Sequence, residues 1–199
     1  KITIQPVDVL GVDAAICVSD ILTTVVPMGI ELHYEAGKGP SYPNPLRSRA
    51  DVEKLIVPDP EETLGFVYDA QRILARELAS KVPLIGFAGS PFTVAAYMIE
   101  GKAGHAFIQL RNLLFKDPDT FHLLMDKVSQ LTAKYLTAQV KAAPNPLLLF
   151  DSHAGALSPI DSLVHPPPSA ERIPPGQQPT SLPTLPFGPA HHATLSATA

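Results

Sequence analysis

Three short apolar runs divide most of the chain into strands that are each followed by helical sequence. The runs cover residues 14–19, 83–87 and 147–150, and they are apolar at nearly every position rather than at alternate positions. Strands of a parallel sheet that is covered on both faces have this pattern. All three runs end in small or polar residues, so we expect a parallel sheet with these residues along one edge.

Apolar residues at helical spacing predict the helices. One covers residues 91–100, with Ser90 as its N-cap, a proline at its first position and Gly101 at its end. A second is marked by Phe107, Leu110 and Leu114. Two further helices open at Asp-Pro pairs, and their apolar positions are Leu64, Val67, Leu74 and Leu78 after Asp59, and Phe121, Leu124, Met125, Val128, Leu131 and Tyr135 after Asp117.

Alternating strands and helices predict an α/β protein with right-handed crossovers. Residues 30–35 alternate between apolar and polar and precede Gly37 and Gly39, which predicts a hairpin outside the sheet with His33 solvated. Polar residues at strand ends are where (β/α) barrels place their chemistry, but a complete eight-stranded barrel takes about 250 residues. We therefore expect a partial (β/α)8 TIM barrel with parallel strands over residues 1–161.

Residues 162–199 differ in composition from the rest of the chain. Nine of the 22 prolines lie there, charged residues are few, and no apolar period of a helix or strand is present. Proline removes backbone donors and disfavours helix at the preceding residue, so this segment is predicted to be a disordered tail.

Charge and cysteine content exclude several classes of protein. The 199 residues have a formal net charge of −4, which argues against binding to nucleic acid. No apolar stretch approaches the roughly 18 to 20 residues of a membrane span, and no signal peptide opens the chain. The single cysteine, Cys17, lies in the first apolar run and is interpreted as a small buried hydrophobic residue. We expect a soluble cytoplasmic protein without a metal.

Three strand-end residues are candidates for chemistry. Asp20 follows the first strand, where its carboxylate could accept N–H groups of a ligand or stabilise a developing positive charge, or could simply cap the next helix. Tyr97 lies on the same side of its helix as Thr93, and it either donates to a ligand or packs beneath the strand edge. Ser152, in D-S-H-A-G, is either a polar contact to a carboxylate or a helix-entry cap.

Four segments together resemble uroporphyrinogen decarboxylase. They are V-D-A-A-I-C-V-S-D-I-L at residues 12–22, G-K-G-P at 37–40, G-F-A-G-S-P-F-T-V-A-A-Y-M-I-E-G at 86–101 and L-F-D-S-H-A-G at 149–155. The third is the signature of that family, and the order and spacing agree from about residue 2 to residue 161.

The resemblance implies a (β/α)8-barrel enzyme, usually a homodimer, that removes four acetate carboxyls from uroporphyrinogen III to give coproporphyrinogen III. No metal or organic cofactor is implied. Asp20 matches the family's active-site aspartate, which accepts the pyrrole N–H groups of the tetrapyrrole. Tyr97 matches its active-site tyrosine, and Ser152 a serine that contacts substrate.

The family's N-terminal arginine motif and its C-terminal strands are missing from this sequence, so we expect a truncated member that does not decarboxylate unaided. A non-catalytic fragment that acts as a binding or interaction module is the first alternative. A related methyltransferase for thiols or corrinoids is the second, and it would need a zinc site that a lone Cys17 does not provide.

Overall fold

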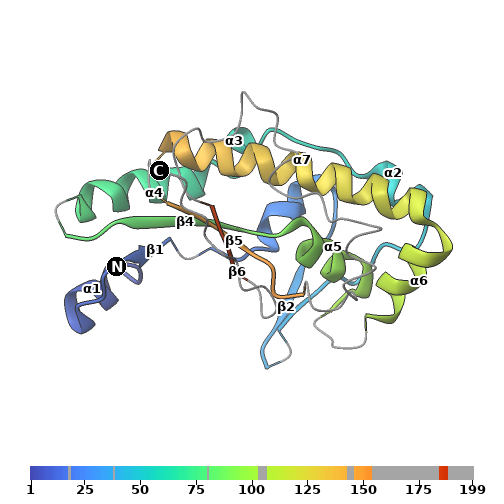
Figure 1. Cartoon of the computed structure of the whole chain (residues 1–199), viewed down its shortest axis with the longest axis horizontal. Helices are drawn as coiled ribbons and strands as arrows, with labels where there is room; N and C mark the ends of the chain where they lie inside the picture. The colour runs from blue at the N-terminus through green and yellow to red at the C-terminus, as the bar shows by residue number, and fades with distance from the viewer. Residues whose placement is uncertain are drawn as a thin grey trace, which may run out of the picture.

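The computed structural model describes residues 1–17, 19–37, 39–79, 81–102, 107–142, 146–153 and 184–187. Strands and helices alternate along this part of the chain, as Figure 1 shows. In chain order the elements are α1 (Gln5–Leu10), β1 (Ala15–Ile16), the 3₁₀ helix η1 (Thr23–Met28), β2 (His33–Glu35), β3 (Gly39–Ser41), α2 (Arg49–Lys54), α3 (Pro60–Thr63), α4 (Gly65–Leu78), β4 (Leu84–Gly89), α5 (Pro91–Glu100), α6 (Ile108–Lys116), α7 (Pro118–Ala142), β5 (Leu147–Phe150) and β6 (Thr184–Phe187).

Four parallel strands form one sheet in the order β1-β4-β5-β6. Leu84 pairs with Ala15 on one side of β4, and Gly86 pairs with Leu147 on the other. The three expected strands are therefore confirmed as neighbours whose carboxyl ends share one edge, although β1 is only two residues long. In the part of the chain that the structure describes, the sheet is not closed into a barrel. The predicted α/β class with parallel strands is thus confirmed.

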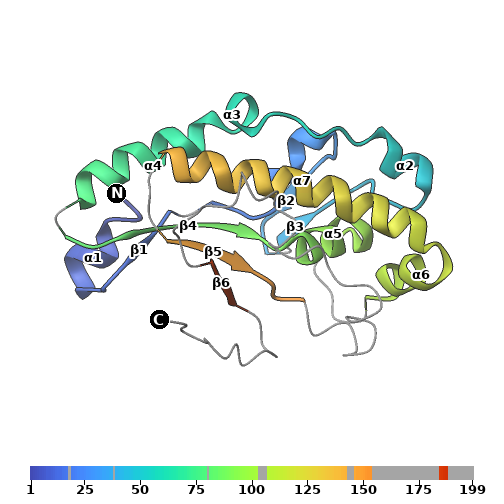
Figure 2. The same cartoon turned by 45° about the horizontal axis from the view of Figure 1, so that its top comes forward.

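Helices α4 and α7 lie side by side over one face of the sheet (Figure 2). Leu84, Ala88 and Leu147 on that face are buried. Side chains of the opposite face are less covered, because Ile85 and Phe87 are only half-buried and Ile16 is 38% exposed. Among the described residues, helices therefore cover one face of the sheet, and the opposite face is less covered than the near-continuous apolar runs predicted.

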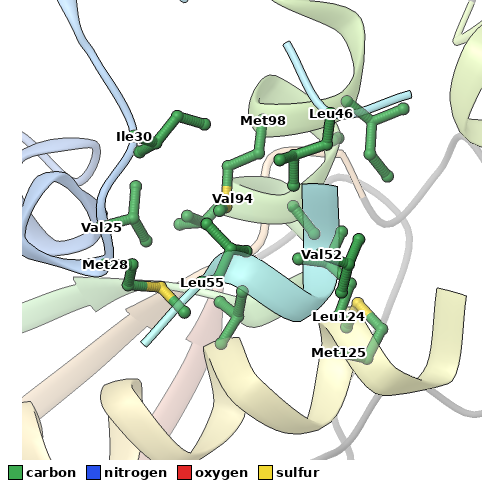
Figure 3. Packing of buried hydrophobic residues seen from close by; sticks show 14 of the residues in the cluster. Val25, Met28, Ile30, Leu46, Val52, Leu55, Val94, Met98, Leu124 and Met125 are labelled. Carbon is green, nitrogen blue, oxygen red and sulfur yellow. The ribbon is translucent and has the colours of Figure 1, made fainter. Parts of the chain in front are cut away.

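The largest hydrophobic core lies beside the sheet, between α5, α7 and η1 (Figure 3). Val94 of α5, Leu124 of α7 and Met28 of η1 belong to this cluster, and Val52 of α2 and Leu55 directly after that helix lie at its centre. All six apolar positions predicted for α7 are buried, which confirms the helical spacing inferred for that segment. This core fixes α5, and with it Tyr97, against the long helix.

Two predicted helices differ from the structure, although the start predicted at Asp59 and Pro60 is confirmed. The helix expected after Asp59 is two helices, α3 and α4, because buried Leu64 leaves the helical conformation at φ −122° and ψ 22°. Phe107 precedes α6 instead of lying on its apolar face, and its φ of 46° is left-handed. Ser90 is the N-cap of α5 by position, but its side chain makes no capping hydrogen bond.

The proline-rich segment contains a strand that was not expected. Thr184–Phe187 form β6 and pair with β5 in parallel. The open edge of β5 offers unpaired backbone groups, and an edge strand tolerates a proline such as Pro186 because only part of its backbone enters the ladder. The rest of the segment 162–199 lies outside the described residues.

Candidate functional site

Asp20 lies just beyond β1, and both of its carboxylate oxygens accept a hydrogen bond. The backbone N–H of Leu22 donates to Oδ1 at 2.8 Å, and the Tyr34 hydroxyl donates to Oδ2 at 2.7 Å. The bond to Leu22 closes the turn that leads into η1. The capping interpretation and the ligand interpretation of Asp20 therefore do not exclude each other, since a carboxylate oxygen accepts two hydrogen bonds.

A close approach between two chain segments holds the Asp20 turn against the end of β4. A Cβ added at Gly89 would lie 3.0 Å from Cβ of Ile21 and 2.7 Å from Cγ2 of Val94. Glycine is needed here because any side chain would push Ile21 away from the strand. Gly89 thereby sets the position of Ile21, and of the neighbouring Asp20, relative to the sheet edge.

The hairpin predicted from the glycines forms and contributes Tyr34. Strands β2 and β3 are antiparallel, with Tyr34 opposite Pro40. His33 is exposed as expected, and its Nε2 lies 2.7 Å from Oε1 of Glu31. Burial and the hydrogen bond to Asp20 raise the pKa of Tyr34, whereas Thr23 acts in the opposite direction. Tyr34 was not singled out from the sequence, because a tyrosine in a short alternating run is an ordinary strand residue.

Tyr42, directly after the hairpin, is a buried tyrosine. Its side chain is 3% exposed, and its hydroxyl has no hydrogen-bond partner among the described residues. Burial raises the pKa of Tyr42, and the negative charges that Asp20, Tyr34 and Tyr97 carry when ionised add to this increase. The Tyr34 hydroxyl bonds to Asp20, and the N–H of Tyr42 just after the hairpin donates to the carbonyl of Gly101 at 2.7 Å, so the hairpin connects Asp20 with the end of the helix that carries Tyr97.

The loop after β5 is held by Thr93 on the first turn of α5. Oγ1 of this fully buried threonine donates to Oδ1 of Asp151 at 2.7 Å and accepts the backbone N–H of His153 at 3.1 Å. The N–H of Ser90 also donates to the carbonyl of Phe150 at 2.6 Å. These roles of Thr93 and Asp151 were not predicted from the sequence, although the two residues follow adjacent strands.

The ring of His153, on this loop, packs against the rings of Tyr97 and Phe107. The His153 ring lies 5.2 Å from the Tyr97 ring and 4.8 Å from the Phe107 ring, between centroids. Tyr97 is half-buried, and Ser152, which precedes His153, is exposed. The structure thus brings Tyr97 together with the loop that carries Ser152. The alternative interpretation of Ser152, as the cap of a following helix, concerns residues outside the described part of the chain, which ends at residue 153 in this region.

Two cavities are lined by described residues other than Asp20, Tyr97 and Ser152. One of about 540 Å³ is lined by residues between Gly29 and Leu55, and one of about 230 Å³ by residues that include Arg47 and Lys116. None of the three predicted site residues lines either cavity. Cys17 is buried, as expected.

The described residues contain no group of three or more His, Cys, Asp or Glu side chains that could hold a metal ion. Within the same residues, no helix combines the length and the apolar composition of a membrane span.

Comparisons with known proteins point to one family. The family described as Uroporphyrinogen decarboxylase (URO-D) matches residues 1–167. A uroporphyrinogen decarboxylase of Citrifermentans bemidjiense is 45% identical over 187 residues, which are 94% of this chain and 55% of that protein. The uroporphyrinogen decarboxylase of Trichlorobacter lovleyi is 50% identical over 161 residues, which are 81% of this chain and 47% of that protein. A Yersinia pestis protein of the same name is 48% identical over 79% of this chain and 44% of its own length.

A solved structure shows the same fold. A methyltransferase from Methanosarcina mazei superposes with a TM-score of 0.67 at 20% identity, covering 81% of this chain and 48% of the methyltransferase. At that identity the likeness concerns the fold alone. The chain spans about half the length of the curated relatives it matches. With a family match over residues 1–167 and relatives at 44–50% identity, this chain belongs to the uroporphyrinogen decarboxylase family.

Proposed function

We propose that this chain carries the Asp20 part of a site that decarboxylates the acetate side chains of uroporphyrinogen III to give coproporphyrinogen III. The observation that carries the proposal is the Asp20 carboxylate, which is fixed through both oxygens and is connected through the hairpin of Tyr34 to the end of the helix that carries Tyr97. Family membership supplies the reaction, and this geometry is compatible with it.

The proposed chemistry uses the negative charge of Asp20. Protonation of a pyrrole carbon gives a cationic ring, and the electrons of the breaking C–C bond flow into that ring as CO₂ leaves. A proton then converts the resulting methylene group into a methyl group, and the ring loses the proton it gained. Asp20 would accept the pyrrole N–H groups and stabilise the cation more strongly than the neutral ring, which lowers the barrier.

Tyr97 and Ser152 complete the proposed site. The Tyr97 phenol would donate a hydrogen bond to the substrate, and the exposed Ser152 hydroxyl would contact one of its carboxylates. The aromatic contact between Tyr97 and His153, the neighbour of Ser152 in the chain, supports a shared location for Tyr97 and Ser152. We also propose, from family membership, that the protein is cytoplasmic and forms a homodimer, that it uses no metal or organic cofactor, and that it does not bind nucleic acid.

Binding without catalysis is a second candidate function. The acceptor positions that remain on the Asp20 carboxylate favour it, since they can receive the N–H groups of a ligand whether or not a reaction follows.

Two measurements test the proposals. Purified protein is incubated anaerobically with uroporphyrinogen III, and coproporphyrinogen is assayed against a blank without protein. Binding of uroporphyrinogen is measured in parallel on the wild type and on Asp20→Ala. Turnover supports catalysis, and binding without turnover that Asp20→Ala abolishes supports the binding module. No binding by either protein refutes both.

A further inference from the structure

Asp20 is anchored from two separate elements. The Leu22 N–H on Oδ1 belongs to its own turn, whereas the Tyr34 hydroxyl on Oδ2 comes from β2, 14 residues further along the chain. A single hydrogen bond to one oxygen leaves the carboxylate free to rotate about its terminal torsion, which is broad in aspartate. A second bond to the other oxygen fixes the plane of the group.

The two bonds leave acceptor capacity on the carboxylate. Each oxygen of an ionised aspartate accepts about two hydrogen bonds. One position on each oxygen is used, so one on each is left for an incoming donor. Asp20 is exposed and the Tyr34 side chain is 58% exposed, so a ligand can reach both from solvent.

The hairpin that carries Tyr34 is itself tied to α5. Ser41 of β3 forms an isolated bridge with Lys102, directly after that helix. The N–H of Tyr42 donates to the carbonyl of Gly101 at 2.7 Å. These contacts fix the hairpin relative to the helix that carries Tyr97, so the Tyr34 hydroxyl places the Asp20 carboxylate relative to Tyr97 as well.

We propose that Tyr34 is a positioning residue of the decarboxylase site: its hydroxyl fixes the orientation of the Asp20 carboxylate so that the remaining acceptor positions of the two oxygens receive pyrrole N–H groups. This inference rests on the proposed function, because it specifies how Asp20 meets a tetrapyrrole. Tyr34 acts through Asp20 and takes no proton in the reaction.

Binding of uroporphyrinogen by the full chain under anaerobic conditions tests the role of the hydroxyl. Tyr34→Phe is expected to weaken binding about fivefold, because one hydrogen bond to a charged group is lost and the carboxylate becomes free to rotate. Asp20→Asn weakens binding further, and adding Tyr34→Phe to it has no additional effect, since the two residues act as one unit. Tyr68→Phe is the matched control, because the Tyr68 hydroxyl is buried without a hydrogen-bond partner among the described residues.

A spectroscopic readout tests the hydrogen bond without any ligand. The tyrosinate absorbance of the wild type is titrated with alkali and compared with that of Asp20→Asn. In Asp20→Asn, one tyrosine is expected to titrate at a lower pH than in the wild type. The reason is that the hydrogen bond to Asp20 and the charge of Asp20 raise the pKa of Tyr34. That difference must become smaller in a Tyr34→Phe background, where only the effect of Asp20 on other tyrosines such as Tyr42 remains. Thermal unfolding midpoints confirm that all variants are folded.

The outcomes separate the inference from the proposed function. If the wild type binds uroporphyrinogen and Asp20→Asn does not, the proposed function stands. The positioning role is then overturned when Tyr34→Phe binds as well as the wild type or more tightly. Tighter binding would mean that the hydroxyl competes with the ligand. An unchanged tyrosinate titration in Asp20→Asn also overturns it, whereas absent wild-type binding overturns the function itself.

Discussion

Thr93 and Asp151 lie 58 residues apart in the chain and are joined by a hydrogen bond of 2.7 Å from Oγ1 to Oδ1. The same Oγ1 accepts the N–H of His153, so one buried hydroxyl fixes the loop after β5 to the first turn of α5. This contact brings the loop of Ser152 to the helix of Tyr97.

Replacing Thr93 by valine keeps the shape of the side chain and removes both hydrogen bonds. The free energy of unfolding is expected to fall by about 2 kcal/mol, because the His153 N–H and the Asp151 carboxylate lose a partner. Urea unfolding measures the change. Thr93→Ser is the control, since it keeps the hydroxyl and is expected to retain most of the stability; equal losses in the two variants would contradict this account.

Gly89→Ala tests the close approach of Ile21 to β4. The new Cβ would lie 2.7 Å from Cγ2 of Val94 and 3.0 Å from Cβ of Ile21, so stability is expected to fall by about 1–3 kcal/mol. Affinity for uroporphyrinogen should fall too, since the Asp20 turn is displaced. Thermal unfolding and binding are measured beside Gly65→Ala, whose Cβ meets nothing within 4 Å. Equal behaviour of the two alanine variants would exclude the steric explanation.

Gln139 of α7 satisfies both backbone polar groups of Phe87. Its Oε1 accepts the N–H at 3.1 Å and its Nε2 donates to the carbonyl at 2.9 Å, while Gln71 donates to Oε1 at 2.6 Å. Gln139→Leu removes these partners from the half-buried Phe87 backbone and from the buried Gln71 side chain, and it is expected to cost on the order of 3 kcal/mol. Chemical denaturation checks this value.

The control for that substitution is Gln130→Leu, because Gln130 is an exposed glutamine on the same helix. Its expected effect is within about 0.5 kcal/mol. A similar small change at Gln139 would show that the contacts to Phe87 do not contribute to stability.

Alkaline pH is expected to destabilise the fold through Tyr135. Burial raises the pKa of Tyr135 from 10.0 to about 12, so the folded state retains a proton that the unfolded state loses. Stability from this group is fully present below pH 10 and is lost as the pH rises through 12. The loss amounts to about 3 kcal/mol. Urea unfolding at several pH values measures it, and Tyr135→Phe should flatten the decline; an identical decline in the variant would refute the assignment.

Local sequence features predicted a large part of the fold. The helix 91–100 has the predicted limits, because a proline at its first position and a left-handed Gly101 after its end act through neighbouring residues alone. The apolar face of α7 and the antiparallel hairpin were predicted for the same reason. Phe107 and Leu64 were misassigned, because tertiary packing outweighs helical spacing where a helix begins.

The sequence by itself determined the family, the parallel strands and the candidate residues Asp20, Tyr97 and Ser152, since motifs and short-range periodicity are written in consecutive positions. The tertiary structure alone decided that Tyr34 bonds to Asp20 and that Thr93 holds Asp151. Those partners come from different elements, and their distance depends on strand register and on close approaches such as that at Gly89. Contacts of this kind follow from packing between elements, which no local pattern of residues specifies.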